Sequence, residues 1–388
     1  MIKQNNMNKI SNALLVLLMI INNIAFYSKN FYSIINIIAV YMNFIILLGL
    51  IFLNGKLVFK KIYIFYITVV MIYCSILLVI NINTGLGSVI TLITGILAFF
   101  VFSRYYISNK VLKIYTFILS LLYIYLFLLS DNYMQKFTLY PDQYINSNVI
   151  AVAALYIAIY LFNLLPLFKI PYRKLLSFLS ILLGIMIILN CKSRASLLAL
   201  FIFILFYYFI PKKFLLNKRF LKIVFISVII IGSIMPFIII TLYKRNIDIV
   251  VPFINKPLYT GREIIWSQMI ELQKENPVSI IFGLGSKVKT HNGELLVAHN
   301  SCAAIIVNFG IVGYILVFGF IVRQFNKILK SIYLSKDSVK YLLGFICIFI
   351  HGFFEYIFLN PLFVIPTFLF LGLAIRISNT IEGIDYRS

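Results

Sequence analysis

Long runs of apolar residues, separated by short polar segments, fill most of the chain. A helix needs about 20 apolar residues to cross the hydrocarbon core of a bilayer. Twelve runs approach this length, near residues 10–27, 31–53, 62–82, 86–102, 111–130, 148–166, 174–190, 195–211, 221–242, 301–322, 341–357 and 361–376. The pattern predicts an all-α polytopic integral membrane protein with about 12 transmembrane helices, forming a single transmembrane domain over residues 1–388. Only Leu-Asn-Pro separates the last two runs, so they could also form one broken helix.

Two polar segments are longer than turns, and they fall on the same side of the predicted helices. The smaller covers residues 131–147 and the larger covers 243–300. Lys and Arg concentrate in the segments of the opposite side, as is typical of cytoplasmic loops. Both termini are therefore predicted to be cytoplasmic, and both long loops extracytoplasmic. The cytoplasmic segments are too short for a nucleotide-binding domain, so any chemistry belongs outside or near the outer membrane face.

Composition agrees with a membrane protein, since 62% of the residues are hydrophobic and 12% are charged. On a soluble protein a net charge of +23 would suggest a nucleic-acid partner. Here the distribution of cytoplasmic cations explains the charge, and no nucleic acid is expected. No cleavage pattern follows the first apolar run, which predicts a retained helix. The four cysteines are scattered, without the spacing of a metal site or a disulfide framework.

Acidic residues are few on the predicted outer face, and they form no Asp-x-Asp pair or carboxylate cluster. They are Asp131, Asp142, Asp248, Glu263, Glu271, Glu275, Glu294 and Glu355. A divalent metal on a diphosphate normally needs such carboxylates. We therefore expect no metal and no cofactor, and any diphosphate would have to be bound by cations.

The first outer cation site is the short turn that contains Lys192 and Arg194. The preference of cations for the cytoplasmic side disfavours two of them here. Arg194 would begin the next helix, and Ser193 could cap it. A guanidinium at a helix N-terminus favours anion binding. Alternatively, Arg194 is an interfacial residue that reaches lipid headgroups.

The second site is Arg262, in the first turn of a predicted amphipathic helix of the large loop. Thr260 is its expected N-cap, and Trp266 would anchor the helix on the outer membrane surface. The helix dipole disfavours a cation in the first turn. This local conflict indicates an anionic partner for Arg262, although a solvated loop arginine is the simpler alternative.

The third site is the pair His299-Asn300, where the largest polar segment meets an apolar run. Histidine is the side chain best suited to move a proton near neutral pH. Gly310 and Gly313 follow on one predicted helix face, which would allow close packing of a neighbouring helix. A second pair, His291-Asn292, lacks such glycines. The alternative is a histidine at the membrane edge without a role.

His351 and Glu355 are four residues apart in the eleventh predicted helix, so they would share a face of that helix. An ion pair or hydrogen bond between them would lower the cost of placing them at membrane depth. Such a pair could serve the site, or it could only lock two helices together.

Several segments together resemble the O-antigen polymerase and O-antigen ligase superfamily (Wzy/WaaL-type proteins). They are SRASLLAL, GREIIW, IIFGLGS, AHNSCAAIIVNFGIVG and HGFFEYIFLNPLF, in the order expected for the family. INSNVIAVAAL, at residues 145–155, is similar to the family's central helix start and assigns Asn148. The resemblance spans about Asn146 to Gly372, while the N-terminal third is similar only in hydropathy.

The resemblance implies a metal-free, inverting glycosyltransferase of the bacterial cytoplasmic (inner) membrane. Its donor would be an oligosaccharide on undecaprenyl diphosphate, presented among membrane lipids at the outer face. The implied roles are catalytic for His299, Arg262 and Arg194, and substrate-binding for Asn300, Lys192, Asn148 and Glu355. His299 would accept a proton from the attacking hydroxyl, and the arginines would hold the diphosphate.

Among the activities of the family, we favour a polymerase of O-antigen or capsule, which would act with a flippase and a chain-length regulator. A ligase that transfers the chain to lipid A core or to a protein is the first alternative. A lipid-linked oligosaccharide flippase is the alternative of another class. Such transporters usually show paired repeats and a midplane site, and the chain has no visible repeat.

Overall fold

The computed structural model describes residues 2–23, 29–53, 61–81, 83–105, 107–140, 143–168, 170–247, 250–251, 256–257, 261–289, 293, 295, 297–330 and 335–381. Its long helices are α1 (Ile2–Ile21), α2 (Lys29–Leu53), α4 (Lys61–Ile80), α5 (Leu86–Arg104), α6 (Asn109–Ser130), α8 (Ser147–Leu164), α9 (Arg173–Asn190), α10 (Arg194–Ile204), α12 (Lys218–Lys244), α13 (Arg262–Glu275), α15 (Ser301–Lys330), α16 (Lys336–His351) and α17 (Pro361–Ile381). Shorter elements are α7 (Tyr133–Leu139), η2 (Leu165–Leu167), the π-helical η3 (Leu205–Phe209), α11 (Lys212–Leu215), α14 (Val278–Phe282) and η4 (Ile357–Leu359). The strands β1 (Val250–Val251) and β2 (Lys256–Pro257) form a short antiparallel ladder.

Each of the twelve predicted apolar runs overlaps one of these long helices. Within the described residues, eight helices are long and apolar enough to cross a membrane: α2, α4, α5, α6, α8, α9, α12 and α15. Part of α1, α10 with η3, and α17 are shorter apolar helices. The prediction of an all-α fold with several helices able to span a membrane is thus confirmed, whereas twelve crossings stays a prediction.

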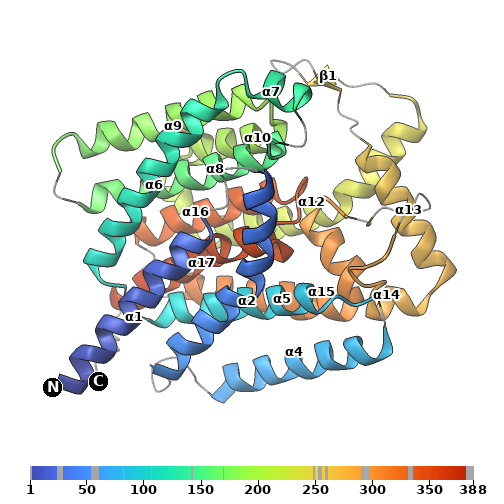
Figure 1. Cartoon of the computed structure of the whole chain (residues 1–388), viewed down its shortest axis with the longest axis horizontal. Coiled ribbons are helices and arrows are strands. Elements are labelled where there is room, and N and C mark those ends of the chain that lie inside the picture. The colour runs from blue at the N-terminus through green and yellow to red at the C-terminus, as the bar shows by residue number, and fades with distance from the viewer. Residues whose placement is uncertain are drawn as a thin grey trace.

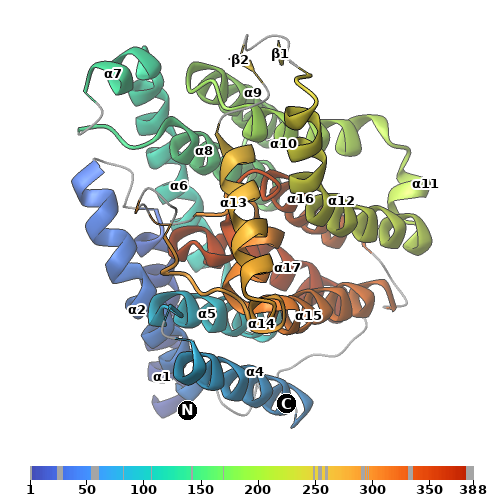
Figure 2. The ribbon, with the colours of Figure 1, turned by 90° about the vertical axis from the view of Figure 1, so that its right-hand side faces the viewer.

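The two long loops contain helices and strands of their own. Helix α7 lies within the smaller loop, and β1, β2, α13 and α14 lie within the larger one. In Figure 1, α13 and α14 lie on the side of the molecule away from the start of α1, and Figure 2 shows α13 standing across the ends of neighbouring helices. The single domain and the extracytoplasmic location of both loops stay predictions.

Helix α8 is the centre of the bundle. Sixteen of its 18 residues are buried, and small residues such as Ala151 and Ala158 let other helices approach closely. Tyr160 stacks on Phe370 of α17 with ring centroids 4.0 Å apart, and its hydroxyl donates to the carbonyl of Pro366 at 2.5 Å. This aromatic contact holds α17 against α8.

Helices α16 and α17 are separate, so the alternative of one broken helix is wrong. Helix α16 ends at His351, with Gly352 as its C-cap. Helix α17 begins after Asn360, whose Oδ1 accepts from the backbone N–H of Leu362 at 3.0 Å. Pro361 then occupies the first helical position, where its missing N–H costs nothing. Residues 352–360 are therefore a non-helical connection with a short 3₁₀ turn, and this connection carries Glu355.

Helix α15 is broken at Gly310, which adopts φ 63° and ψ −172°. The break lets the turn after α14 meet α15 backbone to backbone: the amides of Leu284 and Gly285 donate to the carbonyl of Val307 at 2.6 and 3.2 Å. The carbonyl of Phe309 accepts from the hydroxyl of Tyr73 at 2.5 Å. The carbonyls of Val307 and Phe309 are thus paired despite the break. The expected close approach at Gly310 is present, with the end of the short helix α14 as the neighbour, but the regular helix predicted there is interrupted.

Replacing Gly310 by alanine should destabilise the protein strongly. A Cβ atom would lie 2.0 Å from the carbonyl oxygen of Ile281, at a backbone conformation that only glycine adopts readily. We expect a loss of about 3 kcal/mol or more, measured as a lower melting temperature in detergent. Gly319→Ala is the matched control, because a Cβ there meets nothing within 4 Å. Equal melting temperatures for the two variants would contradict the break at Gly310.

Candidate functional site

The start of α15 is fixed by Asn300, whose side chain is fully buried. Its Oδ1 accepts from the backbone N–H of Ala303 at 2.8 Å, which caps the helix. Its Nδ2 donates to the carbonyls of Gly232 in α12 and Phe353 after α16, both at 3.0 Å. The amide therefore ties three segments together. This geometry makes Asn300 a residue that positions the site, rather than one that faces a ligand.

Ser301 joins the same segments on its other side. Its backbone N–H donates to the carbonyl of Gly352 at 2.7 Å, and its hydroxyl donates to the carbonyl of Glu355 at 2.7 Å. The hydroxyl also accepts from the backbone N–H of Ile357 at 3.0 Å. The connection between α16 and α17 is thus bound along several residues to the first turn of α15, which brings Glu355 next to His299.

Glu355 bridges Arg262 and His299. Its Oε1 accepts from a terminal guanidinium nitrogen of Arg262 at 2.7 Å, and its Oε2 lies 3.4 Å from Nδ1 of His299. The expected pairing with His351 on one helix face is wrong, because α16 ends before Glu355. His351 is buried beneath the bridge, and neither of its ring nitrogens has a hydrogen-bond partner within the described residues. The anionic partner expected for Arg262 is Glu355.

The electrostatics of the bridge keep Glu355 ionised. Burial alone would raise the pKa of Glu355, but the hydrogen bond from His299 and the charge of Arg262 together lower it below its usual value. A carboxylate oriented this way favours the proton on Nδ1 of His299, which leaves Nε2 as the ring atom able to accept a proton. The side chain of His299 is 34% exposed, so a ligand can reach it.

Helix α13 carries Arg262 into place. Its N-cap is Gly261, at φ 84°, and not Thr260, which lies outside the described residues. Trp266 is 2% exposed and its indole N–H donates to the carbonyl of Ala298, directly before His299. The expectation that Trp266 anchors α13 in the membrane surface is therefore wrong. Trp266 instead binds α13 to the segment that carries the histidine.

Arg194 begins α10 as expected, and it lies near enough to Arg262 for their charges to repel each other. Ser193 occupies the N-cap position, but its hydroxyl bonds to Ser196 at 3.2 Å and does not cap the helix. Lys192 precedes it with an exposed side chain and φ 49°. The pair His291-Asn292 lies outside the described residues.

A cavity of about 230 Å³ opens beside the bridge. It is lined by Tyr32, Asn146, Asn148, Val149, Val152, His299, Glu355, Tyr356, Ile357, Asn360 and Phe363. Of the seven site residues predicted from the sequence, His299, Glu355 and Asn148 line it, and Arg262 contacts it through Glu355. Asn300, Arg194 and Lys192 are not among the lining residues. Asn148, in the first turn of α8, is held where its backbone N–H donates to Asn146 Oδ1 at 2.9 Å.

Sequence reasoning missed the aromatic and amide side chains of this cavity. Tyr356 lies edge-on to the ring of His299, with ring centroids 6.2 Å apart, and Asn360 stands at the start of α17. Tyr32 comes from α2, in the part of the chain that matched the family only in hydropathy. Tyrosine and asparagine beside a His and a carboxylate form a lining that suits a polyhydroxylated ligand such as a sugar. In the described part of the chain, no three His, Cys, Asp or Glu residues form a group that could hold a metal ion.

The fold and the site together define a helical protein with several helices able to span a membrane and a cavity lined by a histidine and by a carboxylate that bridges to an arginine. Residues 178–318, just over a third of the chain, match the family profile described as O-antigen ligase. This region is thus similar to the O-antigen polymerase and ligase superfamily, whose members are glycosyltransferase-like enzymes. The matched region includes Arg194, Arg262 and His299 and ends before Glu355. The comparison with curated proteins found no match.

Proposed function

We propose that the chain is a polymerase of bacterial surface polysaccharide, O-antigen or capsule, in the cytoplasmic membrane with both termini inside. It would join oligosaccharide repeat units carried on undecaprenyl diphosphate, at the outer membrane face. The observation that carries this proposal is the Arg262–Glu355–His299 chain beside a cavity lined by tyrosine and asparagine. The family match supports glycosyl transfer of the polymerase or ligase type.

In the proposed reaction, His299 Nε2 takes the proton of the acceptor sugar's hydroxyl. The hydroxyl oxygen attacks the anomeric carbon of the donor from the face opposite the leaving group, so the configuration inverts. The bond between that carbon and the diphosphate oxygen breaks, and the lipid diphosphate leaves with the electron pair. One bond to the anomeric carbon forms as another breaks, and the proton of the hydroxyl ends on His299.

The leaving diphosphate gains negative charge, which cations stabilise in the transition state. Arg262 has five N–H donors, and the contact with Glu355 involves one terminal nitrogen of the guanidinium. Arg194 would supply a second guanidinium from the N-terminus of α10, where the helix dipole also favours an anion. Lys192 would contribute charge at the rim. Asn148 would bind a sugar hydroxyl within the cavity, and Asn300 would hold His299 in position.

A ligase that transfers the finished chain to lipid A core, or to a protein, uses the same donor and would use the same residues. We favour the polymerase on the frequency of such proteins among divergent family members. A flippase is the candidate of another class, and the position of the histidine cavity at the helix ends argues against it, since carriers place their site near the midplane. A flippase and a chain-length regulator are proposed as partners of the polymerase.

Reconstitution decides between these functions. The full chain is placed in vesicles with a short oligosaccharide on undecaprenyl diphosphate, and the products are separated on a gel. A ladder of chains that grows by one repeat unit, without any other acceptor, is expected for the polymerase. Transfer only after lipid A core is added would show a ligase. Movement of the donor across the bilayer without chain growth would show a transporter and overturn the glycosyltransferase proposal.

A further inference from the structure

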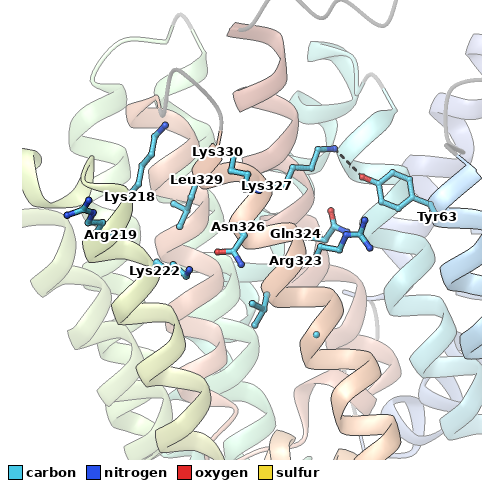
Figure 3. Close-up of a pocket in the computed structure, with 12 residues that line it drawn as sticks. Tyr63, Lys218, Arg219, Lys222, Arg323, Gln324, Asn326, Lys327, Leu329 and Lys330 are labelled. Atoms are coloured by element: carbon cyan, nitrogen blue, oxygen red, sulfur yellow. Dashed lines mark hydrogen bonds between the residues drawn. The ribbon is translucent and has the colours of Figure 1, made fainter.

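A second and larger cavity lies at the other end of α15. Its volume is about 850 Å³, and it is formed by the beginning of α12, the end of α15 and Tyr63 of α4 (Figure 3). His299 precedes the first residue of α15, and this cavity surrounds the last turns of the same 30-residue helix. The part of α15 after the break at Gly310, residues 311–330, alone spans about 30 Å. The cavity is therefore separate from the histidine site and opens at the opposite face of the bundle.

Six cations line this cavity: Lys218, Arg219, Lys222, Arg323, Lys327 and Lys330. Among its described lining residues there is no carboxylate. Three of these residues belong to the start of α12 and three to the end of α15. Figure 3 shows Asn326 between Lys222 and Arg323. The guanidinium of Arg104 adds charge nearby, over the ring of Tyr63 at 5.3 Å. Like charges gathered in this way repel one another unless an anion lies between them.

A preference of cations for cytoplasmic helix ends explains only part of this cluster. The cations of α15 lie in its last turns, where the helix dipole favours positive charge. Those of α12 lie in its first turns, where the dipole disfavours it. Asn217 already caps α12, since its Oδ1 accepts from the backbone N–H groups of Arg219 and Phe220 at 2.9 and 3.2 Å. An anion held between the two helices would relieve the unfavourable positions on α12.

An apolar groove continues from the cationic cavity along the surface of the bundle. It has a volume of about 170 Å³ and shares Tyr63, Gly319, Arg323 and Gln324 with the larger cavity. The walls of the groove are Tyr66 and Ile315, with Leu316 and Phe320. Tyr66 is fixed there by its hydroxyl, which donates to the carbonyl of Leu316 at 2.6 Å, and by stacking on Phe320. Ile315 is 62% exposed, so the groove faces the surroundings of the helices.

We propose that the cationic cavity binds the phosphate headgroup of an anionic phospholipid, and that the groove between α4 and α15 receives one of its acyl chains. The charge cluster matches a phosphate, which basic pockets between transmembrane helices commonly bind. The adjoining groove matches an apolar chain attached to that phosphate. With the orientation proposed above, the lipid belongs to the inner leaflet. It would hold the inner ends of α12 and α15 together, while their outer parts contribute Gly232 and Asn300 to the histidine site.

The headgroup contact is tested on the purified full chain in a neutral detergent. Phosphatidylglycerol, cardiolipin and, as the uncharged control, phosphatidylcholine are titrated, and binding is followed by native mass spectrometry and by the melting temperature. Either anionic lipid should bind at least about tenfold more tightly than phosphatidylcholine. Replacing Lys222 and Arg323, both exposed, by glutamine should weaken anionic binding about 10- to 30-fold. Lys212→Gln with Lys213→Gln removes the same charge from α11, outside the lining, and should change binding less than twofold.

The acyl-chain contact is tested separately with Gly319→Leu. Gly319 is exposed and a Cβ there meets nothing within 4 Å, so a leucine side chain can extend into the junction of cavity and groove without changing any charge. This variant should weaken binding of the anionic lipid and leave binding of inorganic pyrophosphate unchanged. Equal binding of all three lipids, equal loss in the Lys212 and Lys213 control, or an unchanged affinity in Gly319→Leu would overturn the proposal. A clear preference for undecaprenyl phosphate over the phospholipids would overturn the phospholipid as occupant. None of these readouts depends on the polymerase activity.

Discussion

Cells whose only copy of this protein carries His299→Ala are expected to lose their long polysaccharide chains. The alanine removes the ring that faces the cavity and is oriented by Glu355, and with it the proposed proton acceptor. Loss of a general base typically costs about 10²- to 10⁴-fold in rate. A gel of the cell's polysaccharide should therefore show the single repeat unit and no ladder. Membrane fractions should contain the variant at the level of the unaltered protein, because the ring lies at the wall of the cavity and a third of its side chain is exposed.

The control for this experiment is His291→Ala, which alters the other His-Asn pair of the same loop. It should leave the ladder unchanged. A normal ladder in His299→Ala, or its loss in His291→Ala alone, would show that the proton acceptor is not His299. Asn300→Ala is expected to lower the amount of folded protein, unlike His299→Ala, because it removes the buried cap of α15.

Arg262→Lys is expected to be nearly as damaging to chain growth as Arg262→Ala. Lysine keeps the charge, but it cannot bond Glu355 and a diphosphate at once with the planar geometry of a guanidinium. We expect loss of the polysaccharide ladder in cells. The matched control is Arg245→Lys, because Arg245 is an exposed arginine at the end of α12. This control should leave the ladder unchanged. A normal ladder in Arg262→Lys would show that only the positive charge at this position is needed, and not the geometry of the guanidinium.

The bridge itself can be measured with a double-mutant cycle of Arg262→Ala and Glu355→Gln, read as melting temperature. The half-buried pair should give a coupling energy of about 1–3 kcal/mol. The pKa of Glu355 is lowered in the folded protein, so its stabilising effect is complete at neutral pH. The effect is lost as the pH falls through that lowered value. Glu355→Gln should therefore melt lower than the unaltered protein at neutral pH and approach it in acid. Parallel pH profiles for the two proteins would contradict the bridge.

The helices were predictable because their apolar runs are long and nearly free of charge. The polar residues of the site could also be found one by one, since a histidine or an arginine at a helix end stands out against an apolar background. Which of these residues contact one another could not be predicted from the sequence. Four-residue spacing assigned Glu355 to His351 on the assumption that the helix continued, but α16 ends at His351 and Asn360 starts a new helix. Glu355 therefore turns towards residues that lie 56 and 93 positions earlier in the chain.

Two other errors have the same origin, since a local pattern cannot name a distant partner. An aromatic residue on an amphipathic helix is typical of a membrane surface, but Trp266 is buried and its indole N–H donates to the carbonyl of Ala298. Gly310 suited helix–helix packing, yet its positive φ breaks α15 so that the turn after α14 can bond to it. The cations of the second cavity were interpreted only as signals of orientation. Their convergence from α12 and α15 depends on the fold.

The attachment of α13 and α14 to α15 has a consequence for the energetics of any reaction at the histidine. Trp266 fixes one helix to the residue before His299, and the turn after α14 is bonded to Val307 eight positions further on. The guanidinium of Arg262 is thus held relative to the imidazole before any substrate arrives. The entropy of aligning these groups is lost when the chain folds, and not at each turnover. Substrate binding then has to order only the substrate.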